Sequence, residues 1–386
     1  MGATLVGSVE EMSLVYLDHA ASTPMRPTAV EAMLPYLSEQ FANPSGSHRF
    51  ARASRRAIDE ARDQVAEVLG VAPGEVVFTS CGTESDNTVL AGVGGAAVCS
   101  AAEHHAVLHP VEHRGDGRIV ATDAAGHVDL DRLAEACDDS VGVVSVMAVN
   151  NEVGTVTDLA AVAAVVREHA PRAVLHTDAV QAPCWLDLRS VAPLVDAMSF
   201  SAHKFGGPKG VGVLTVRRDV DVAPLIVGGG QERERRSGTH NVAGITALAA
   251  ALVETDRERP AELVRIGALR DRLVDRLTGA LDGVVETVPR ERKVAGSAHV
   301  CIAGVENEAL LFLLDEADVC ASAASACASG AMEPSHVLAA MGVDRELALG
   351  ALRMTLGHTT TAADVDRAAE VVVDAVEHLR ARGAAS

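Results

Sequence analysis

Two strand-like stretches that end in polar residues constrain the fold of this 386-residue chain more than any other feature. Residues 141–149 are almost continuously apolar and end at Asn150, and residues 173–177 form a second run that ends at Asp178. Such runs are typical of strands buried on both faces of a parallel sheet. Because helical spacing over residues 158–169 separates them, the pattern predicts an open, largely parallel α/β sheet. Ligands of such sheets lie beyond the carboxyl ends of the strands.

The composition excludes several classes of protein. A hydrophobic content of 48% allows a large core, and a net charge of −20 argues against direct nucleic-acid binding, which needs a basic surface. No apolar stretch reaches the length of about 18 residues that a membrane span needs, and the N-terminus lacks a secretory pattern. The seven scattered cysteines form no disulfide framework. We therefore expect a cytoplasmic protein that binds neither nucleic acid nor membranes.

A charged segment at residues 254–260 is the best candidate for a domain boundary. It separates a helix expected over residues 242–253 from a strongly helical stretch over residues 263–281. We expect a large domain over residues 16–258 and a smaller α+β domain over residues 259–386. Residues 1–15 have no clear pattern and could pack on the smaller domain.

Lysine is scarce, and one lysine stands in an unusual setting. The chain has only Lys204, Lys209 and Lys293 among its 33 basic residues. Lys204 directly follows a histidine and precedes a glycine-rich turn within residues 199–212. A lysine that forms an imine cannot be replaced by arginine, because a guanidinium is not a usable amine nucleophile. Lys204 is therefore a candidate Schiff-base lysine with pyridoxal 5'-phosphate (PLP) as cofactor, and a solvated turn lysine is the equal alternative at this point.

Two further segments offer binding groups. After a β-rich run at residues 75–80, Gly82 and Thr83 are typical of a helix start with Thr83 as N-cap, and such an end suits a phosphate. His105, His109 and His113, spaced four apart, could share a helical face and ligate a metal. Pro110 interrupts that face and no partner Cys or His motif stands nearby, so we predict no metal site.

A PLP enzyme needs more than its lysine. It needs an acid beside the pyridine nitrogen, donors for the phosphate, a flat group over the ring and a group for the substrate carboxylate. Candidates for these roles, most of them where a strand ends or a helix begins, are Asp178, Gly82 with Thr83, His104 and Arg353. Their joint occurrence is far more specific than any one of them.

Together the motifs resemble those of the cysteine desulfurases in the class V aminotransferase family, which are fold type I PLP enzymes. The resemblance covers about residues 16–361 and implies a mostly parallel sheet flanked by helices in the large domain, plus the small α+β domain. The matching motifs are Asp18-His19-Ala20-Ala21-Ser22-Thr23-Pro24, Asn43-Pro44-Ser45 with His48, Thr83-Glu84-Ser85-Asp86-Asn87, Glu103-His104, Asn150-Asn151-Glu152-Val153-Gly154, Asp178 with Gln181, Ser201-Ala202-His203-Lys204, Arg236-Ser237-Gly238-Thr239, Ser325-Ala326-Cys327 and Arg353.

The resemblance implies a role for each matching position around the cofactor ring. Lys204 would bind PLP as an imine, Asp178 would pair with the ring nitrogen, and His104 would stack on the ring and shuttle protons. Gln181 would contact the ring hydroxyl. Asn151 would lie beside the cofactor and the substrate carboxylate.

The resemblance also implies which residues bind the phosphate and the substrate. Phosphate contacts would come from Gly82, Thr83, Ser201 and His203. Thr239 would reach the phosphate of the neighbouring subunit, which implies a homodimer. Arg353 would bind the carboxylate of L-cysteine through its two-pronged guanidinium.

Cys327 would be the residue that accepts sulfur. The implied reaction takes sulfur from L-cysteine, releases L-alanine and leaves a persulfide on Cys327 for a protein acceptor such as an iron–sulfur scaffold or a thiolation protein. The small-residue segment at 321–335 resembles the family members with a long mobile cysteine loop. Ala324 departs from the glycine usual at its position, and alanine would strain a left-handed backbone there.

Two alternatives remain open. A selenocysteine lyase, or another class V lyase or aminotransferase, would keep Lys204, Asp178 and Arg353 but would not need Cys327 on a mobile loop. A non-catalytic scaffold for sulfur-transfer partners would need none of the PLP residues, so their presence counts against it.

Overall fold

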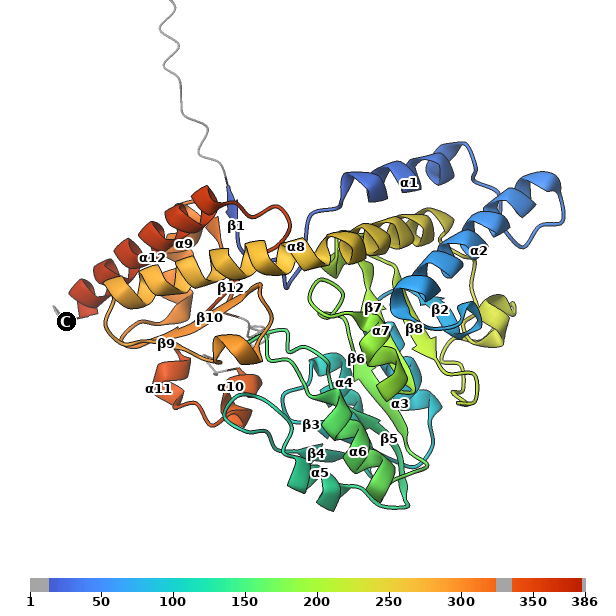
Figure 1. Ribbon diagram of the computed structural model, residues 1–386, viewed down its shortest axis with the longest axis horizontal. Coiled ribbons are helices and arrows are strands. Elements are labelled where there is room, and N and C mark those ends of the chain that lie inside the picture. The colour runs from blue at the N-terminus through green and yellow to red at the C-terminus, as the bar shows by residue number, and fades with distance from the viewer. Residues whose placement is uncertain (1–13, 324–334, 384–386) are drawn as a thin grey trace, which may run out of the picture.

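The core of the protein is a seven-stranded sheet. The computed structural model describes residues 14–323 and 335–383 (Figure 1). In that part of the chain the strand order is β2-β8-β7-β6-β5-β3-β4. The strands from β7 to β4 run parallel, while β8 is antiparallel to both of its neighbours, so the expected largely parallel sheet is confirmed. The strands are β2 (Val76–Thr79), β3 (Ala96–Ser100), β4 (Arg118–Val120), β5 (Val141–Ser145), β6 (Val174–Asp178), β7 (Ala197–Ser201) and β8 (Gly212–Val216).

Helices cover both faces of this sheet, because alternate strand residues point to opposite sides. Phe78, Val98 and Val144 face one hydrophobic cluster, while their neighbours Val77 and Val143 face another. The first cluster is covered by α2 (Arg49–Leu69), α5 (Leu130–Ala136), α6 (Leu159–His169), α7 (Leu188–Val191) and the start of α8 (Val242–Ala280). The second is covered by α3 (Gly82–Gly92) and α4 (His105–Glu112).

A smaller unit lies at the other end of α8 (Figure 1). Its antiparallel sheet has the order β12-β10-β9 and packs against helices in a separate hydrophobic cluster. Near the start of the described chain, β1 (Val15–Tyr16) pairs in parallel with β11 (Val319–Cys320), and Val15 and Leu17 join that cluster. Its other elements are β9 (Val284–Glu286), β10 (Ser297–Ile302), α9 (Asn307–Glu316), α10 (His336–Ala340), α11 (Arg345–Ala348), β12 (Ala351–Thr355) and α12 (Ala362–Gly383).

The helix α8 corrects the sequence analysis. The expected break between two helices at residues 254–260 is wrong, because the segment lies inside one continuous helix of 39 residues that contains Pro260. These charged residues lie in a helix because residues from distant segments of the chain form ion pairs with them. Arg26, just before α1 (Pro27–Ser38), pairs with Glu254 and Glu258 at 2.9 and 2.6 Å, and Asp256 pairs with Arg189 at 2.5 Å.

The two ends of α8 belong to different clusters. Its residues up to Leu252 pack in the large cluster, and those from Ile266 onward pack in the smaller one. The proposed boundary at residues 258/259 therefore falls within the helix. Within the described ranges, the apolar stretches of the helices are too short or too interrupted by charge to cross a membrane.

Substitution of Arg26 tests how much its ion pairs with α8 contribute to the stability of the protein. We expect Arg26→Met to lower the free energy of unfolding by about 2 kcal/mol, because it removes the buried guanidinium that pairs with both Glu254 and Glu258. Urea denaturation measures the change. The matched control is Arg257→Met, since Arg257 is exposed and pairs with Glu258 at 3.3 Å. An equal loss in both variants would contradict the assignment.

Candidate active site

Lys204 lies just beyond the carboxyl end of β7. A single turn of 3-10 helix (Ala202–Lys204) follows the strand. Gly206 then takes a positive φ of 89°, and a Cβ added there would lie 2.6 Å from the Arg26 side chain. The Lys204 Nζ atom donates to the carbonyls of Ala20 and Ala21 at 2.5 and 3.0 Å. The strand end, the turn and the segment before α1 thus fix the position of the amine.

The amine faces a cavity of about 360 Å³ at the carboxyl ends of the parallel strands. Ten residues predicted for the site line it together: Gly82, Thr83, His104, Asn151, Asp178, Gln181, Ser201, His203, Lys204 and Arg353. They come from both structural units, since Arg353 is on β12 and the others belong to the large sheet and its connections. The fold therefore brings together groups up to 271 residues apart in sequence, the separation of Gly82 and Arg353.

One end of the cavity is the N-terminus of α3. The helix begins at Gly82, with Cys81 in the cap position and without a capping side chain, so the prediction of Thr83 as N-cap is wrong. The correction suits anion binding better, because the first backbone N–H groups are left without a capping partner. A Cβ on Gly82 would lie 2.6 Å from Val180, so only glycine fits there. His203 lies beside this end, with its Nδ1 atom 3.3 Å from Ser22 Oγ.

A buried amine and a buried acid give the cavity its charge. Burial, with the charge of Arg353, lowers the pKa of Lys204 to about 8. Burial raises the pKa of Asp178 to about 6, although the Val180 N–H bonds the carboxylate at 2.9 Å and Lys204 attracts it. Near neutral pH Lys204 is therefore poised to exchange its proton, while Asp178 is mostly a carboxylate.

His104 enters the cavity as a neutral imidazole. Desolvation and the nearby charge of Lys204 lower the pKa of His104 to about 4. The ring caps α4, because its Nδ1 atom accepts the Ala106 N–H at 3.1 Å. The ring proton is therefore on Nε2. A neutral ring held at a helix start is well suited to lie over a planar ligand.

Arg353 and Asn151 leave polar atoms available in the cavity wall. Arg353 donates to the Asn151 carbonyl at 3.0 Å and pairs with Asp18 at 2.7 Å. Among the described residues, its Nε atom and the Asn151 Oδ1 atom are buried without a hydrogen-bond partner. Buried polar atoms are rarely left unpaired, so these two indicate a polar ligand.

Sequence reasoning missed two buried acids beneath the cavity. Asp86 lies four residues after Gly82 on α3 and lines the cavity, and its Oδ1 atom has no hydrogen-bond partner in the described chain. Burial and the Asp178 charge raise the pKa of Asp86 well above its usual value, and burial does the same for Glu103. Burial therefore favours the neutral form of both acids, whereas the Val180 N–H and Lys204 favour the charged form of Asp178. The spacing of four from Gly82 was the available signal.

One predicted site residue lies outside the cavity lining, and two other named positions are not among the described residues. Thr239 is exposed and outside the cavity lining. Cys327 and Ala324 lie outside the described residues. On either side of that segment, Ser322 pairs with the Arg353 backbone, and the Ser335 hydroxyl donates to Glu152.

The histidine series on α4 gives no metal site. The rings of His105 and His109 stack at 4.6 Å, and His336 packs on His105 at 4.5 Å. No group of three or more ligand side chains is arranged for a metal in the chain as described. Contrary to the sequence argument, Pro110 lies inside the helix.

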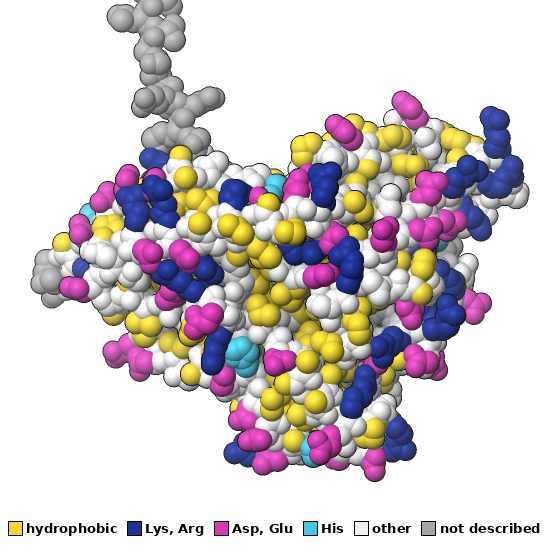
Figure 2. Space-filling view, in the orientation of Figure 1, with side chains coloured by type: hydrophobic (Ala, Val, Ile, Leu, Met, Phe, Trp, Pro, Cys, Tyr) yellow, Lys and Arg dark blue, Asp and Glu magenta, His cyan; other side chains and the backbone are white. Residues whose placement is uncertain are grey.

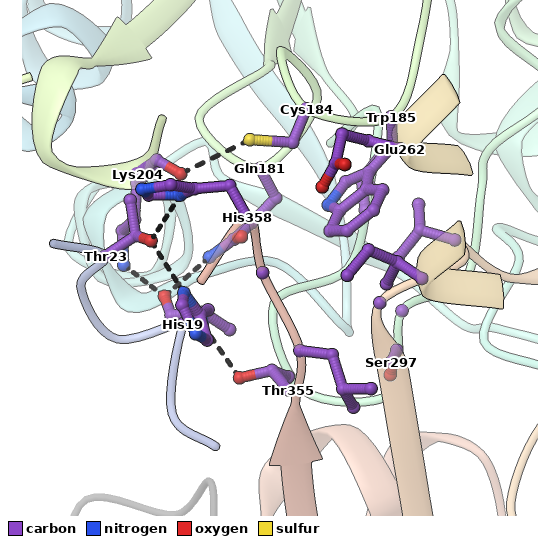
Figure 3. Close-up of a pocket in the computed structure, with 18 of the residues that line it drawn as sticks. His19, Thr23, Gln181, Cys184, Trp185, Lys204, Glu262, Ser297, Thr355 and His358 are labelled. Atoms are coloured by element: carbon purple, nitrogen blue, oxygen red, sulfur yellow. Dashed lines mark hydrogen bonds between the residues drawn. The ribbon is translucent and has the colours of Figure 1, made fainter. Parts of the chain in front are cut away.

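A second, narrower cavity lies behind the lysine (Figure 3). It shares Lys204 and Gln181 with the first cavity and is closed by Trp185 and Glu262. Its volume of about 50 Å³ holds only a few water molecules. Of the two described cavities, the larger one therefore has the room for a substrate-sized molecule beside Lys204.

Comparison with known proteins identifies the family. The model for Aminotransferase class-V matches residues 15–368, so the chain belongs to the class V aminotransferase family. An IscS-like cysteine desulfurase from Mycobacterium tuberculosis is 44% identical over 385 residues, which cover 95% of this chain and 97% of the relative. Within the family, the chain therefore belongs to the cysteine desulfurases, as its motifs predicted.

Solved structures agree with this assignment and confirm the expected fold. A NifS-like protein aligns with a TM-score of 0.88 at 34% identity, covering 95% of this chain and 100% of that protein. A structure described as SspA in complex with cysteine aligns with a TM-score of 0.77 at 30% identity, covering 88% and 98% of the two chains.

The lowered pKa of Lys204 predicts the pH at which its amine reacts. Only the neutral amine attacks a carbonyl, and a lowered pKa makes that form available at lower pH. We expect reductive methylation of Lys204 in the apo-protein, followed by peptide mass spectrometry, to rise with a midpoint near pH 8 rather than 10.5. Exposed Lys209 in the same turn controls for the reagent. A midpoint for Lys204 at its ordinary value would contradict the effect of burial.

Proposed function

We propose that the protein is a PLP-dependent cysteine desulfurase, which removes sulfur from L-cysteine and releases L-alanine. The observation that carries the proposal is the meeting of Lys204, Asp178 and the unpartnered Arg353 Nε atom in one cavity. The names of the relatives support the reaction, and the cysteine in the SspA structure supports the substrate class.

The cavity residues fit PLP. Lys204 would hold the cofactor, Asp178 would hold a proton at its ring nitrogen, and Gln181 would contact its ring hydroxyl. The open end of α3 at Gly82 and Thr83, together with Ser201 and His203, would bind the phosphate. When bound, PLP would supply an electron sink for bonds at the substrate α-carbon.

The protein's own side chains would then divide the remaining work. Arg353 would orient the substrate carboxylate beside Asn151. The amine of Lys204, with its pKa of about 8, would take and return protons near neutral pH. His104 would lie over the ring and move protons through Nε2. Cys327 would accept the sulfur as a persulfide and pass it to a protein acceptor.

We also propose that the enzyme is a cytoplasmic homodimer in which Thr239 reaches the cofactor phosphate of the neighbouring subunit. Thr239 is exposed and lies outside the lining of the cavity in its own subunit as described. Exposed apolar side chains on and next to α1, among them Leu34 (54%), Leu37 (59%) and Phe41 (72%), suit an interface (Figure 2). An iron–sulfur scaffold or a thiolation protein would be the sulfur acceptor.

Activity measurements test the reaction. Purified protein with PLP should release alanine from L-cysteine and form a persulfide. Lys204→Ala should abolish the visible absorbance of the bound cofactor, and Cys327→Ser should lower turnover by a factor of about 100 or more with that absorbance retained. The matched control is Cys320→Ser, which we expect to remain active because Cys320 lies in β11 away from the cavity lining.

Other outcomes decide between the alternatives. Turnover that is equal in Cys327→Ser and the unchanged protein would favour a lyase or aminotransferase, including a selenocysteine lyase. The lack of any cofactor absorbance after addition of PLP would favour a scaffold instead.

Substrate recognition by Arg353 can be tested separately. Arg353→Lys keeps the charge but loses the planar pair of donors, so KM for L-cysteine should rise about tenfold while kcat changes less. Cysteamine, which lacks the carboxylate, is the control ligand and should bind both proteins equally. Unchanged KM for L-cysteine would contradict the assigned role.

A further inference from the structure

The connection between β8 and α8 contains a strained left-handed turn. Glu232, Arg233 and Glu234 are consecutive non-glycine residues with φ values of 50°, 58° and 67°. Left-handed backbone costs about 1–2 kcal/mol per residue, so three in a row need strong support. Such strain is retained where it fixes the position of something useful.

One buried carboxylate supports the turn. Glu232 is 5% exposed and accepts four hydrogen bonds. Arg62 on α2 donates two of them, at 2.7 and 2.6 Å, and the backbone N–H of Phe78 on β2 donates a third at 3.0 Å. His240 donates the fourth from Nε2 at 2.7 Å. Burial raises the pKa of Glu232, but the bonds from His240 and Arg62 outweigh it and lower the pKa to about 2.

These bonds close the segment that carries Thr239. Glu232 lies at its beginning and His240 at its end, so one carboxylate joins both ends of residues 232–240. The Gly238 N–H of this segment also donates to the side chain of Gln231, the residue just before it, at 2.8 Å. The segment is thus held to the sheet through Arg62 and Phe78 and closed on itself through His240.

A second interaction links residues 232–240 to α3, whose N-terminus faces the cavity. Arg236 donates to both carboxylate oxygens of Glu84, at 2.8 and 3.2 Å. Glu84 lies in the first turn of α3 and also accepts the Ser80 N–H at 2.9 Å. The backbone on both sides of the exposed Thr239 is therefore held in place by several hydrogen bonds and ion pairs.

We propose that Glu232 is a positioning residue for Thr239, and that the left-handed turn exists to aim Thr239 at the cofactor phosphate of the neighbouring subunit. The inference rests on the proposed role of Thr239 in a homodimer. Glu232 itself touches neither cofactor nor substrate. Its bond to His240 transmits the fixed position of β2 and α2 to the residue next to Thr239.

The affinity of the dimeric apo-protein for PLP tests the inference. We expect Glu232→Gln to weaken PLP binding about tenfold, because the amide places donors against Arg62 and His240 and loses a charged acceptor. Thr239→Ala should weaken it to a similar extent. Pyridoxal, which lacks the phosphate, should bind the Glu232→Gln variant as it binds the unchanged protein.

The double variant separates positioning from simple stabilisation. If Glu232 acts through Thr239, Glu232→Gln combined with Thr239→Ala should bind PLP no more weakly than the weaker single variant. Glu234→Gln is the matched control, since it removes the same charge from an exposed residue of the same turn. His240→Gln, which spares the Arg62 pair, replaces Glu232→Gln if that variant fails to fold.

Each outcome has a defined meaning. Unchanged PLP affinity in Thr239→Ala would overturn the proposed role of Thr239 and, with it, this inference. If Thr239→Ala weakens PLP binding and Glu232→Gln does not, the positioning role of Glu232 alone would be overturned. The positioning role would also be overturned if the two losses of PLP affinity multiply in the double variant. The same holds if Glu232→Gln weakens the binding of pyridoxal as much as that of PLP.

Discussion

The bonds of Arg26 are the interaction on which the rest of the structure depends. Its side chain pairs with Glu254 and Glu258 on α8, and its backbone N–H donates to the Gly206 carbonyl at 2.9 Å. Thr255 on the same helix donates to the Phe205 carbonyl at 3.0 Å. The turn that carries Lys204 is therefore fixed to the helix that spans both structural units. Because Arg353 comes from the second unit, this connection sets the distance between the two sides of the active site.

The electrostatics of the cavity follow from an excess of buried acids. Asp178, Asp86 and Glu103 are buried close together, so desolvation and mutual repulsion raise their pKa values, and among the described cavity residues Lys204 and Arg353 supply positive charge. Asp178 keeps its charge because it has the Val180 N–H and the attraction of Lys204. Because burial disfavours the charged forms of Asp86 and Glu103, Asp178 is the acid best placed to act on a cofactor with one ring nitrogen.

The sequence predicted the parts of the fold and site that depend on local pattern. Apolar runs reveal the buried strands, and the polar residues that follow each run mark the strand ends. Asp178 and Lys204 were found in this way, and both line the cavity. The continuity of α8 was missed because its charged middle is stabilised by Arg26 and Arg189, which are remote in sequence. Burial of Asp86 and the left-handed turn at Glu232 were missed for the same reason, since tertiary contacts override local preference. The position of Cys327 stays a prediction.

The ion pair between Asp18 and Arg353 also has a consequence for how the protein is made. These residues are 335 positions apart, and β1 pairs with β11, so the first described strand needs a partner from the final fifth of the chain. During synthesis the large sheet can form while this partner is still missing. Closing such a long loop is slow and comes late in folding. The wall of the active site that holds Arg353 is thus completed last, so a chain released early would have the lysine in place but no means of holding a carboxylate.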